Sequence, residues 1–134
     1  MTYDRSTMAS GKFAPGKHVL IDLYGAKNLT KVELIKDALQ NAATICGAEV
    51  LNTNLHSFGE NAGVTGVALL AESHISIHTW PELDYAAIDI FMCGNCEPEL
   101  AIEPLKQFFN ANDSAVNIIH RGQNAPSSQT QKTA

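Results

Sequence analysis

The chain is poor in basic residues, in charge of either sign and in long apolar runs. It carries 9 Lys and Arg against 14 Asp and Glu, for a formal net charge of −5 at pH 7. Proteins that bind nucleic acid neutralise phosphates with clustered basic residues, so this balance argues against a nucleic-acid partner. No apolar run approaches the roughly 20 residues that a membrane-spanning helix needs. We therefore expect neither nucleic acid nor a membrane as a partner.

Cysteine is also scarce, and no secretory signal is visible. Three cysteines, an odd number, fit reduced thiols better than a disulfide framework. The opening residues MTYDRSTMASGKFAPGK lack the apolar core of a signal peptide. We therefore expect a cytoplasmic protein.

The composition nevertheless supports a globular core. Apolar residues make up 45% of the 134 residues and charged residues 17%, which is typical of one folded domain. We expect that domain at residues 17–122, after a flexible segment at 1–16. A polar stretch at 123–134, QNAPSSQTQKTA, predicts a disordered tail.

Periodicity in the sequence predicts the element order β-α-β-β-β-β-α-β. Thr30 and Glu33 predict a capping box at the first helix. The links between the central strands are short, so we expect an antiparallel sheet covered on one face by two helices, a two-layer α+β sandwich. If the other face is apolar, a second copy of the chain is its simplest cover, which predicts a dimer. The expected strands are 18–25, 48–58, 64–72, 74–80, 85–93 and 114–122, and the expected helices are 30–47 and 97–112.

The segment LLAESHISIHTWPE, residues 69–82, places an acid, a serine and a histidine close together. The Ser73 hydroxyl could attack the carbonyl of Glu72 and convert the amide into an ester. Loss of the Ser73 α-proton would then expel the Glu72 carboxylate and leave dehydroalanine, which hydrolyses to a pyruvoyl group and ammonia. This chemistry needs a strained backbone, a proton acceptor and a donor to the oxyanion. His78 could face the hydroxyl across a local bend, and Thr65 could reach the same carbonyl if the flanking strands are antiparallel.

The same segment resembles the small prokaryotic class of S-adenosylmethionine decarboxylase proenzymes. The segments GKHVLIDLYG, GVTGV and YAAIDIFMCG share the resemblance, which extends from about residue 16 to residue 122. It implies that Ser73 becomes a covalent pyruvoyl group after cleavage between Glu72 and Ser73. The products would be a β chain of residues 1–72 and an α chain of residues 73–134.

The resemblance also implies a role for five further residues. It makes His78 the proton acceptor in processing, Thr65 a processing hydroxyl and Cys93 the proton donor in decarboxylation. It implies that Glu82 contacts the ribose of S-adenosylmethionine and that Phe58 stacks on its adenine. The implied product, decarboxylated S-adenosylmethionine, supplies spermidine biosynthesis, and the implied assembly is a dimer of processed units, α2β2, with no metal.

The implied chemistry is consistent with these residue types. A pyruvoyl ketone forms a Schiff base with an α-amine and takes up electrons as CO2 leaves. A thiol such as Cys93 can protonate the resulting carbon if its pKa lies near the working pH.

Two departures from the family pattern leave another substrate open. The loop GENAG at 59–63 is longer than the family's usual link, and position 65 carries Thr where Ser is common. Both are compatible with a pyruvoyl decarboxylase of a smaller amino acid, such as ornithine or arginine.

Two further alternatives involve no catalysis. Cys93 and Cys96 with His74 and His78 could form a zinc site of the Cys2His2 type. A non-catalytic subunit could keep the fold and support a catalytic partner. Such a subunit would not need Glu72, Ser73, His78 and Cys93, all of which are present.

Overall fold

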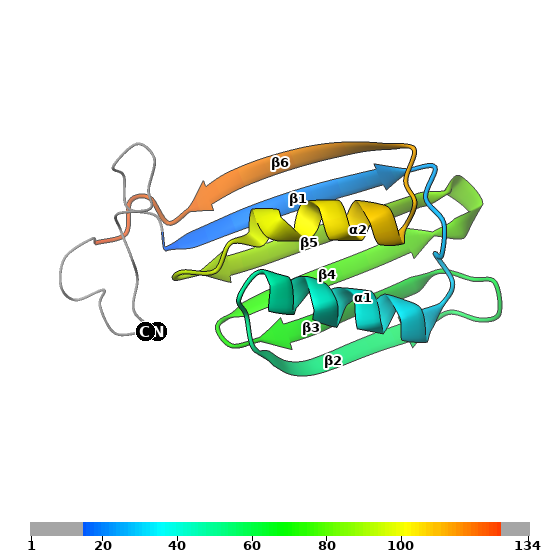
Figure 1. The fold of residues 1–134 in the computed structure, drawn as a ribbon, viewed down its shortest axis with the longest axis horizontal. Helices are drawn as coiled ribbons and strands as arrows, with labels where there is room; N and C mark the ends of the chain where they lie inside the picture. Colours follow the sequence, from blue (N-terminus) through cyan, green and yellow to red (C-terminus); the bar gives the residue numbers. More distant parts are fainter. Residues whose placement is uncertain (1–14, 127–134) are drawn as a thin grey trace.

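A computed structural model describes residues 15–126 and contains one six-stranded antiparallel sheet with two α-helices on one of its faces (Figure 1). The strand order is β2-β3-β4-β5-β1-β6. The predicted element order and the two-layer α+β sandwich are confirmed. The elements are β1 (Gly16–Tyr24), α1 (Val32–Ile45), β2 (Val50–Ser57), β3 (Val64–Leu70), β4 (Ser73–Trp80), η2 (Pro81–Leu83), β5 (Tyr85–Cys93), η3 (Pro98–Ala101), α2 (Ile102–Phe108) and β6 (Asp113–Arg121).

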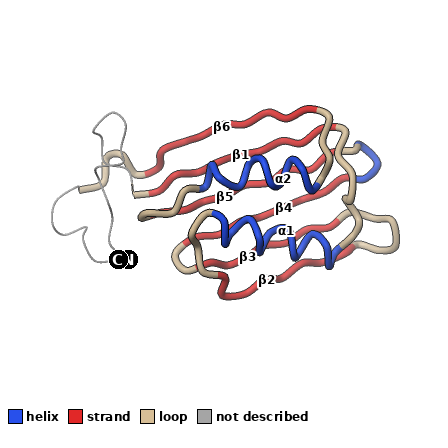
Figure 2. Tube along the Cα trace, viewed as in Figure 1, coloured by secondary structure: helices blue, strands red, loops and turns tan. Residues whose placement is uncertain are grey.

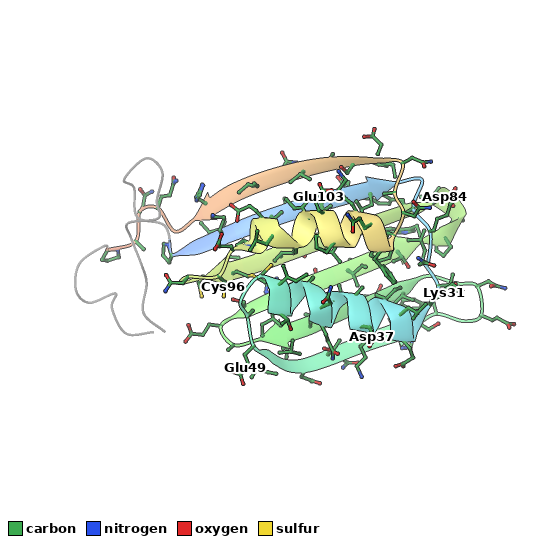
Figure 3. The ribbon with its side chains drawn as sticks, viewed as in Figure 1. Lys31, Asp37, Glu49, Asp84, Cys96 and Glu103 are labelled. Atoms are coloured by element: carbon green, nitrogen blue, oxygen red, sulfur yellow. The ribbon has the colours of Figure 1, made fainter. Side chains whose placement is uncertain are left out.

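The antiparallel order places different connections at the two ends of the sheet (Figure 2). Only Ala71 and Glu72 separate β3 from β4, so this turn lies at the same end as the end of β5. The link between β4 and β5, which contains η2, lies at the other end with the loop between β2 and β3. Cys96 and Asp84, labelled in Figure 3, mark these two ends.

Strand alternation separates a packed face from a helix-free face. Along β1 and β4, every second residue is buried beneath the helices, as at Ile21, Ile75 and Ile77. The intervening residues point to the opposite face, which no described helix covers. We call this the helix-free face; it includes His18, Tyr24, Thr65, Val67, His74, Ser76, His78, Trp80, Asp89 and Phe91.

The predicted capping box at Thr30 is wrong. Helix α1 begins at Val32 with Lys31 at its N-cap and without a side-chain capping bond. The buried Thr79 hydroxyl donates to the Leu29 carbonyl at 2.7 Å, which ties the chain to β4 just before the helix. Thr30 therefore lies ahead of the capping position.

The expected domain ends can be compared with the structure only in part. Gly16, placed in the expected flexible segment, opens β1. The rest of that segment up to residue 14, and residues 127–134 of the expected tail, lie outside the described residues. Within residues 15–126, none of the helices is both long and apolar enough to cross a membrane.

Candidate active site

The turn between β3 and β4 holds Glu72 in a left-handed conformation, with φ of 62°. Four other non-glycine residues of the described chain have a positive φ, and all four are Asn or Asp, which tolerate this region. Glu72 lacks the short polar side chain that eases such a backbone. A residue held this way costs on the order of 1–2 kcal/mol, so the peptide bond that follows Glu72 begins in a strained turn.

Ser73 opens β4 and points into the packed face. The residue is 9% exposed, and its Oγ has no hydrogen-bond partner among the described residues. A buried hydroxyl without a partner costs on the order of 1–3 kcal/mol. Because Ser73 directly follows Glu72, this hydroxyl is covalently placed within reach of the Glu72 carbonyl carbon.

Cys93, the last residue of β5, lies against the same peptide group. Its thiol donates to the Glu72 carbonyl oxygen at 3.1 Å. Burial raises the pKa of the Cys93 thiol, and the Glu72 carboxylate raises it further. The thiol therefore stays protonated at neutral pH and can serve as a proton or hydrogen-bond donor.

His78 and Thr65 lie at the other end of the sheet. They face each other across β3 and β4, with 3.1 Å between Thr65 Oγ1 and His78 Nδ1. Five residues separate His78 from Ser73 along a regular strand, about 16 Å at roughly 3.3 Å per residue. Their side chains also point to opposite faces of the sheet. A single chain thus has no bend that would bring His78 or Thr65 to the Glu72–Ser73 bond.

The two residues expected to contact substrate lie near His78. Phe58 is 64% exposed beside the loop from β2 to β3. Its ring packs edge-on against the ring of His56, with 4.7 Å between the two centroids. Glu82 lies in η2, directly after β4. The predicted site residues therefore form two groups. We call Glu72, Ser73 and Cys93 the serine end, and Thr65, His78, Phe58 and Glu82 the histidine end.

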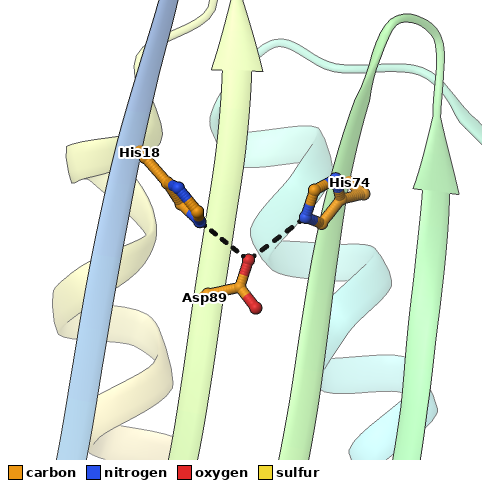
Figure 4. Close-up of side chains that lie close together, drawn as sticks. All are labelled: His18, His74 and Asp89. Carbon is orange, nitrogen blue, oxygen red and sulfur yellow. Dashed lines mark hydrogen bonds and ion pairs between the residues drawn. The ribbon is translucent and has the colours of Figure 1, made fainter. Parts of the chain in front are cut away.

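A third group, around Asp89, was not anticipated from the sequence. Asp89 lies between His18 and His74 on the helix-free face, and both imidazoles bond to its carboxylate (Figure 4). Alternation along each strand places these residues on one face. Their contact depends on the order β4-β5-β1, which local patterns do not reveal.

The predicted zinc set does not assemble. Among residues 15–126 the one group that brings three metal-ligating side chains together is His18, His74 and Asp89. His78 lies at the opposite end of the sheet from Cys93, and the Cys96 thiol donates to the Gly47 carbonyl at 3.6 Å.

Comparison with known proteins identifies the family. A family model described as S-adenosylmethionine decarboxylase matches residues 17–122. The chain belongs to the S-adenosylmethionine decarboxylase family. It is therefore an enzyme, and the resemblance seen in the sequence is confirmed; a decarboxylase of ornithine or arginine is not favoured.

Curated relatives and a solved structure agree with this assignment. A relative from Thermomicrobium roseum, named S-adenosylmethionine decarboxylase proenzyme, is 38% identical over 108 residues, which cover 80% of this chain and 93% of the relative. One from Prochlorococcus marinus with the same name is 45% identical over 109 residues, covering 79% and 86%. The crystal structure of the adenosylmethionine decarboxylase from Aquifex aeolicus is 33% identical, with a TM-score of 0.74 over 87% of this chain and 98% of that one.

Proenzymes of this family form a covalent pyruvoyl group by self-cleavage. The residues of this chain fit such a group at position 73. The serine lies at a strained turn, its buried hydroxyl has no partner within the described residues, and a protonated thiol contacts the preceding carbonyl.

Proposed function

We propose that this chain cuts itself between Glu72 and Ser73 and then decarboxylates S-adenosylmethionine, using residues from two copies. The observation that carries the proposal is the left-handed Glu72, whose carbonyl oxygen accepts from Cys93 beside the unsatisfied Ser73 hydroxyl. The product would supply spermidine biosynthesis, in keeping with the family. The cytoplasmic location expected from the sequence stays a prediction.

In the processing step, Ser73 Oγ attacks the Glu72 carbonyl carbon. The carbonyl oxygen gains negative charge, and the Cys93 thiol at 3.1 Å is placed to donate to it. The left-handed backbone at Glu72 is strained. This strain is released when the amide becomes an ester and the original turn opens, and the release favours the reaction. A base must still take the Ser73 proton. Among the described residues, the serine end of one chain offers the Glu72 carboxylate, 4.0 Å from Cys93 Sγ, but no imidazole on the face of Ser73.

We assign that role to His78 of a second copy, with Thr65 as its hydroxyl partner. Both residues lie on the helix-free face; His78 is about 16 Å along β4 from its own Ser73, and Thr65 is paired with it on β3. If two copies meet through this face with their β4 strands reversed, the histidine end of each copy lies at the Glu72–Ser73 turn of the other, on the side from which Cys93 contacts the Glu72 carbonyl. Each dimer would then contain two composite sites, and cleavage would yield α2β2.

In the decarboxylation step, the pyruvoyl group supplies a carbonyl that accepts the electrons of the departing carboxylate. Cys93, whose pKa is raised by burial and then by Glu72, holds the proton that the substrate carbon needs. Phe58 offers an exposed ring for adenine, and Glu82 offers a carboxylate for the ribose hydroxyls. Both belong to the histidine end, so in this arrangement they act on the partner's serine end.

Intact mass spectrometry and CO2 release test the function directly. The purified chain should separate into fragments of residues 1–72 and 73–134, the second beginning with a ketone in place of an amine. Labelled CO2 should come from S-adenosylmethionine and not from ornithine or arginine. Ser73→Ala should leave one uncut, inactive chain; normal cleavage of that variant would remove the mechanism.

Mixed dimers test the composite site. Ser73→Ala and His78→Ala copies should each stay uncut alone, because every site lacks one group. When the two are expressed together, a mixed dimer contains one site with Ser73 from one copy and His78 from the other. We expect the His78→Ala copy to be cut in that mixture. A mixture that stays uncut, although mixed dimers form, would place His78 in the same chain as its serine or outside the mechanism.

A further inference from the structure

Asp89 ties three strands together on the helix-free face. Its Oδ1 accepts from His18 Nε2 at 3.0 Å and from His74 Nε2 at 3.1 Å. The Ser76 hydroxyl donates to Oδ2. Figure 4 shows the two imidazoles converging on the carboxylate from the strands on either side. One side chain of β5 therefore holds β1 through one residue and β4 through two.

The partners of His18 favour a hydrogen-bond network over a metal site. Two imidazoles and a carboxylate are also a common ligand set for transition metals. However, Arg121 donates to His18 Nδ1 at 3.2 Å, and an arginine has no acceptor. A neutral His18 must then carry its proton on Nε2, where it donates to Asp89 and offers no lone pair to a metal.

His74 is held from a second direction by Phe91. The two rings are stacked, with 5.9 Å between centroids and 10° between planes. Phe91 in turn lies over Gly16, where an added Cβ would come within 2.4 Å of the ring. The imidazole of His74 is therefore fixed by its bond to Asp89 and by the face of Phe91.

The network stands at the end of the strand that the cut exposes. His74 directly follows Ser73, and Ser76 is the next residue of β4 on that face. Before cleavage, residue 73 is held by the two-residue turn from β3. After cleavage it is the first residue of a separate chain, and chain ends fray unless they are held in place. Two of the first four side chains of that new chain bond to Asp89.

We propose that Asp89 is a positioning residue for the decarboxylase: through His74 and Ser76 it holds the cut end of β4, and with it the group formed from Ser73, in register beside Cys93. The inference rests on the proposed self-cleavage. It concerns only residues of this chain and assigns Asp89 no direct contact with the substrate.

The ionisation of Asp89 is consistent with this role. Partial burial alone would raise the pKa of the carboxyl, but hydrogen bonds from Ser76, His18 and His74 outweigh burial and lower it. The carboxylate is therefore fully charged at neutral pH, and bonds to a charged acceptor are stronger than bonds to a neutral one.

Comparing cut and uncut chains tests the proposal. Asp89→Asn is made in the self-cleaving chain and, separately, in the uncut Ser73→Ala chain. Hydrogen exchange of amides 74–77 is measured in all four proteins under conditions where sedimentation shows the same assembly. We expect Asp89→Asn to speed this exchange about tenfold or more in the cut protein, because the loss of a hydrogen bond to a charged group changes a local opening equilibrium by about that factor. In the uncut protein the turn still holds the strand, so the change should be much smaller.

Glu99→Gln is the matched control, because it removes a carboxylate that accepts from Lys17 at 2.7 Å and lies outside the Asp89 network. It should alter exchange at 74–77 in neither background. In steady-state assays Asp89→Asn should lower kcat about tenfold with KM changed less than about twofold. If Asp89→Asn does not fold, His74→Phe removes the donor and keeps a ring against Phe91, and the same comparison is made.

The possible outcomes separate the positioning role from the proposed function. Equal effects of Asp89→Asn on cut and uncut chains would make the network merely structural and overturn the inference, as would unchanged exchange and unchanged kcat. If the wild-type chain is never cut, the proposed function fails and the inference fails with it. If the wild-type chain is cut and active, the four-protein comparison decides the role of Asp89 alone.

Discussion

At the scale of single residues, Glu72 combines two properties that the chemistry needs. Its backbone is left-handed, with φ of 62°, and its carbonyl oxygen accepts from Cys93. The fold places strain and a hydrogen-bond donor on the same peptide group. Each property can be changed separately by substitution.

Glu72→Gly should slow self-cleavage. Glycine adopts a positive φ without steric cost, so the variant loses strain on the order of 1–2 kcal/mol, equivalent to roughly tenfold in rate. The fraction of uncut chain is followed over time by mass spectrometry. Asn110→Gly, at a similar backbone (φ of 45°) between α2 and β6, is the control and should cut at the wild-type rate. Faster cleavage of Glu72→Gly would contradict a role for strain.

The pH dependence of kcat should report Cys93. Its pKa is raised by burial first and by the Glu72 carboxylate second. A proton donor is lost as the pH rises through its pKa, so kcat should hold across neutral pH and fall only above the ordinary thiol value of about 8.5. Glu72→Gln removes the second cause and should move the fall to lower pH. If the pH at which kcat falls is the same in Glu72→Gln as in the wild type, the proton donor is a residue other than Cys93.

At the scale of elements, β4 is the strand on which both halves of the site depend. Ser73 opens it towards the packed face, and His78 lies near its end on the helix-free face. Its register with β3 pairs Thr65 with His78. The same register pairs Leu70 with Ser73, so a change that shifts β3 would disturb both the Thr65–His78 pair and the start of β4.

Gly66→Ala should weaken β3 and the pair it supports. An added Cβ would lie 2.0 Å from Leu55 Cδ2 and 2.6 Å from the Asn54 carbonyl oxygen on β2. Such overpacking costs about 1–3 kcal/mol and should lower Tm by several degrees. Gly47→Ala has nothing within 4 Å of the added Cβ and should cost only the left-handed backbone penalty. If Gly66→Ala and Gly47→Ala lower Tm equally, β2 moves at Leu55 to make room for the added methyl group.

At the scale of the whole molecule, the two ends of the sheet are each incomplete. In the proposed mechanism the serine end holds the bond to be cut and a donor but, among the described residues, no imidazole on the face of Ser73. The histidine end holds a base and an exposed ring but lacks the bond to be cut. The helix-free face joins the two ends, so association through that face would complete both at once.

Val67→Lys should separate the copies and stop cleavage. Val67 lies on the helix-free face, midway along β3, and a lysine there on both copies would introduce like charges. Sedimentation should show a single-chain mass, and mass spectrometry an uncut chain. Val116→Lys makes the same change on the helix side of β6 and should leave assembly and cleavage intact. A separated Val67→Lys chain that still cuts itself would show that one copy suffices.

Several features of this protein followed from the sequence alone. Short-range signals, such as alternation, helical periodicity and glycine-rich turns, were enough for the element order and the two-layer architecture. The residues around Ser73 pointed to self-cleavage, because that chemistry requires neighbours along the chain. The capping box was the local exception: α1 begins at Val32 with Lys31 at its N-cap, just after the Leu29 carbonyl that accepts from Thr79 on β4.

Tertiary structure alone decided which of these residues meet. The order β4-β5-β1 brings Asp89 between two histidines that lie 56 positions apart in the chain, at 18 and 74. Because β4 is straight, His78 lies far from Ser73, although the two residues are close in sequence. Contacts across a sheet depend on strand order and facing, which arise from long-range pairing, so no local pattern could have specified them.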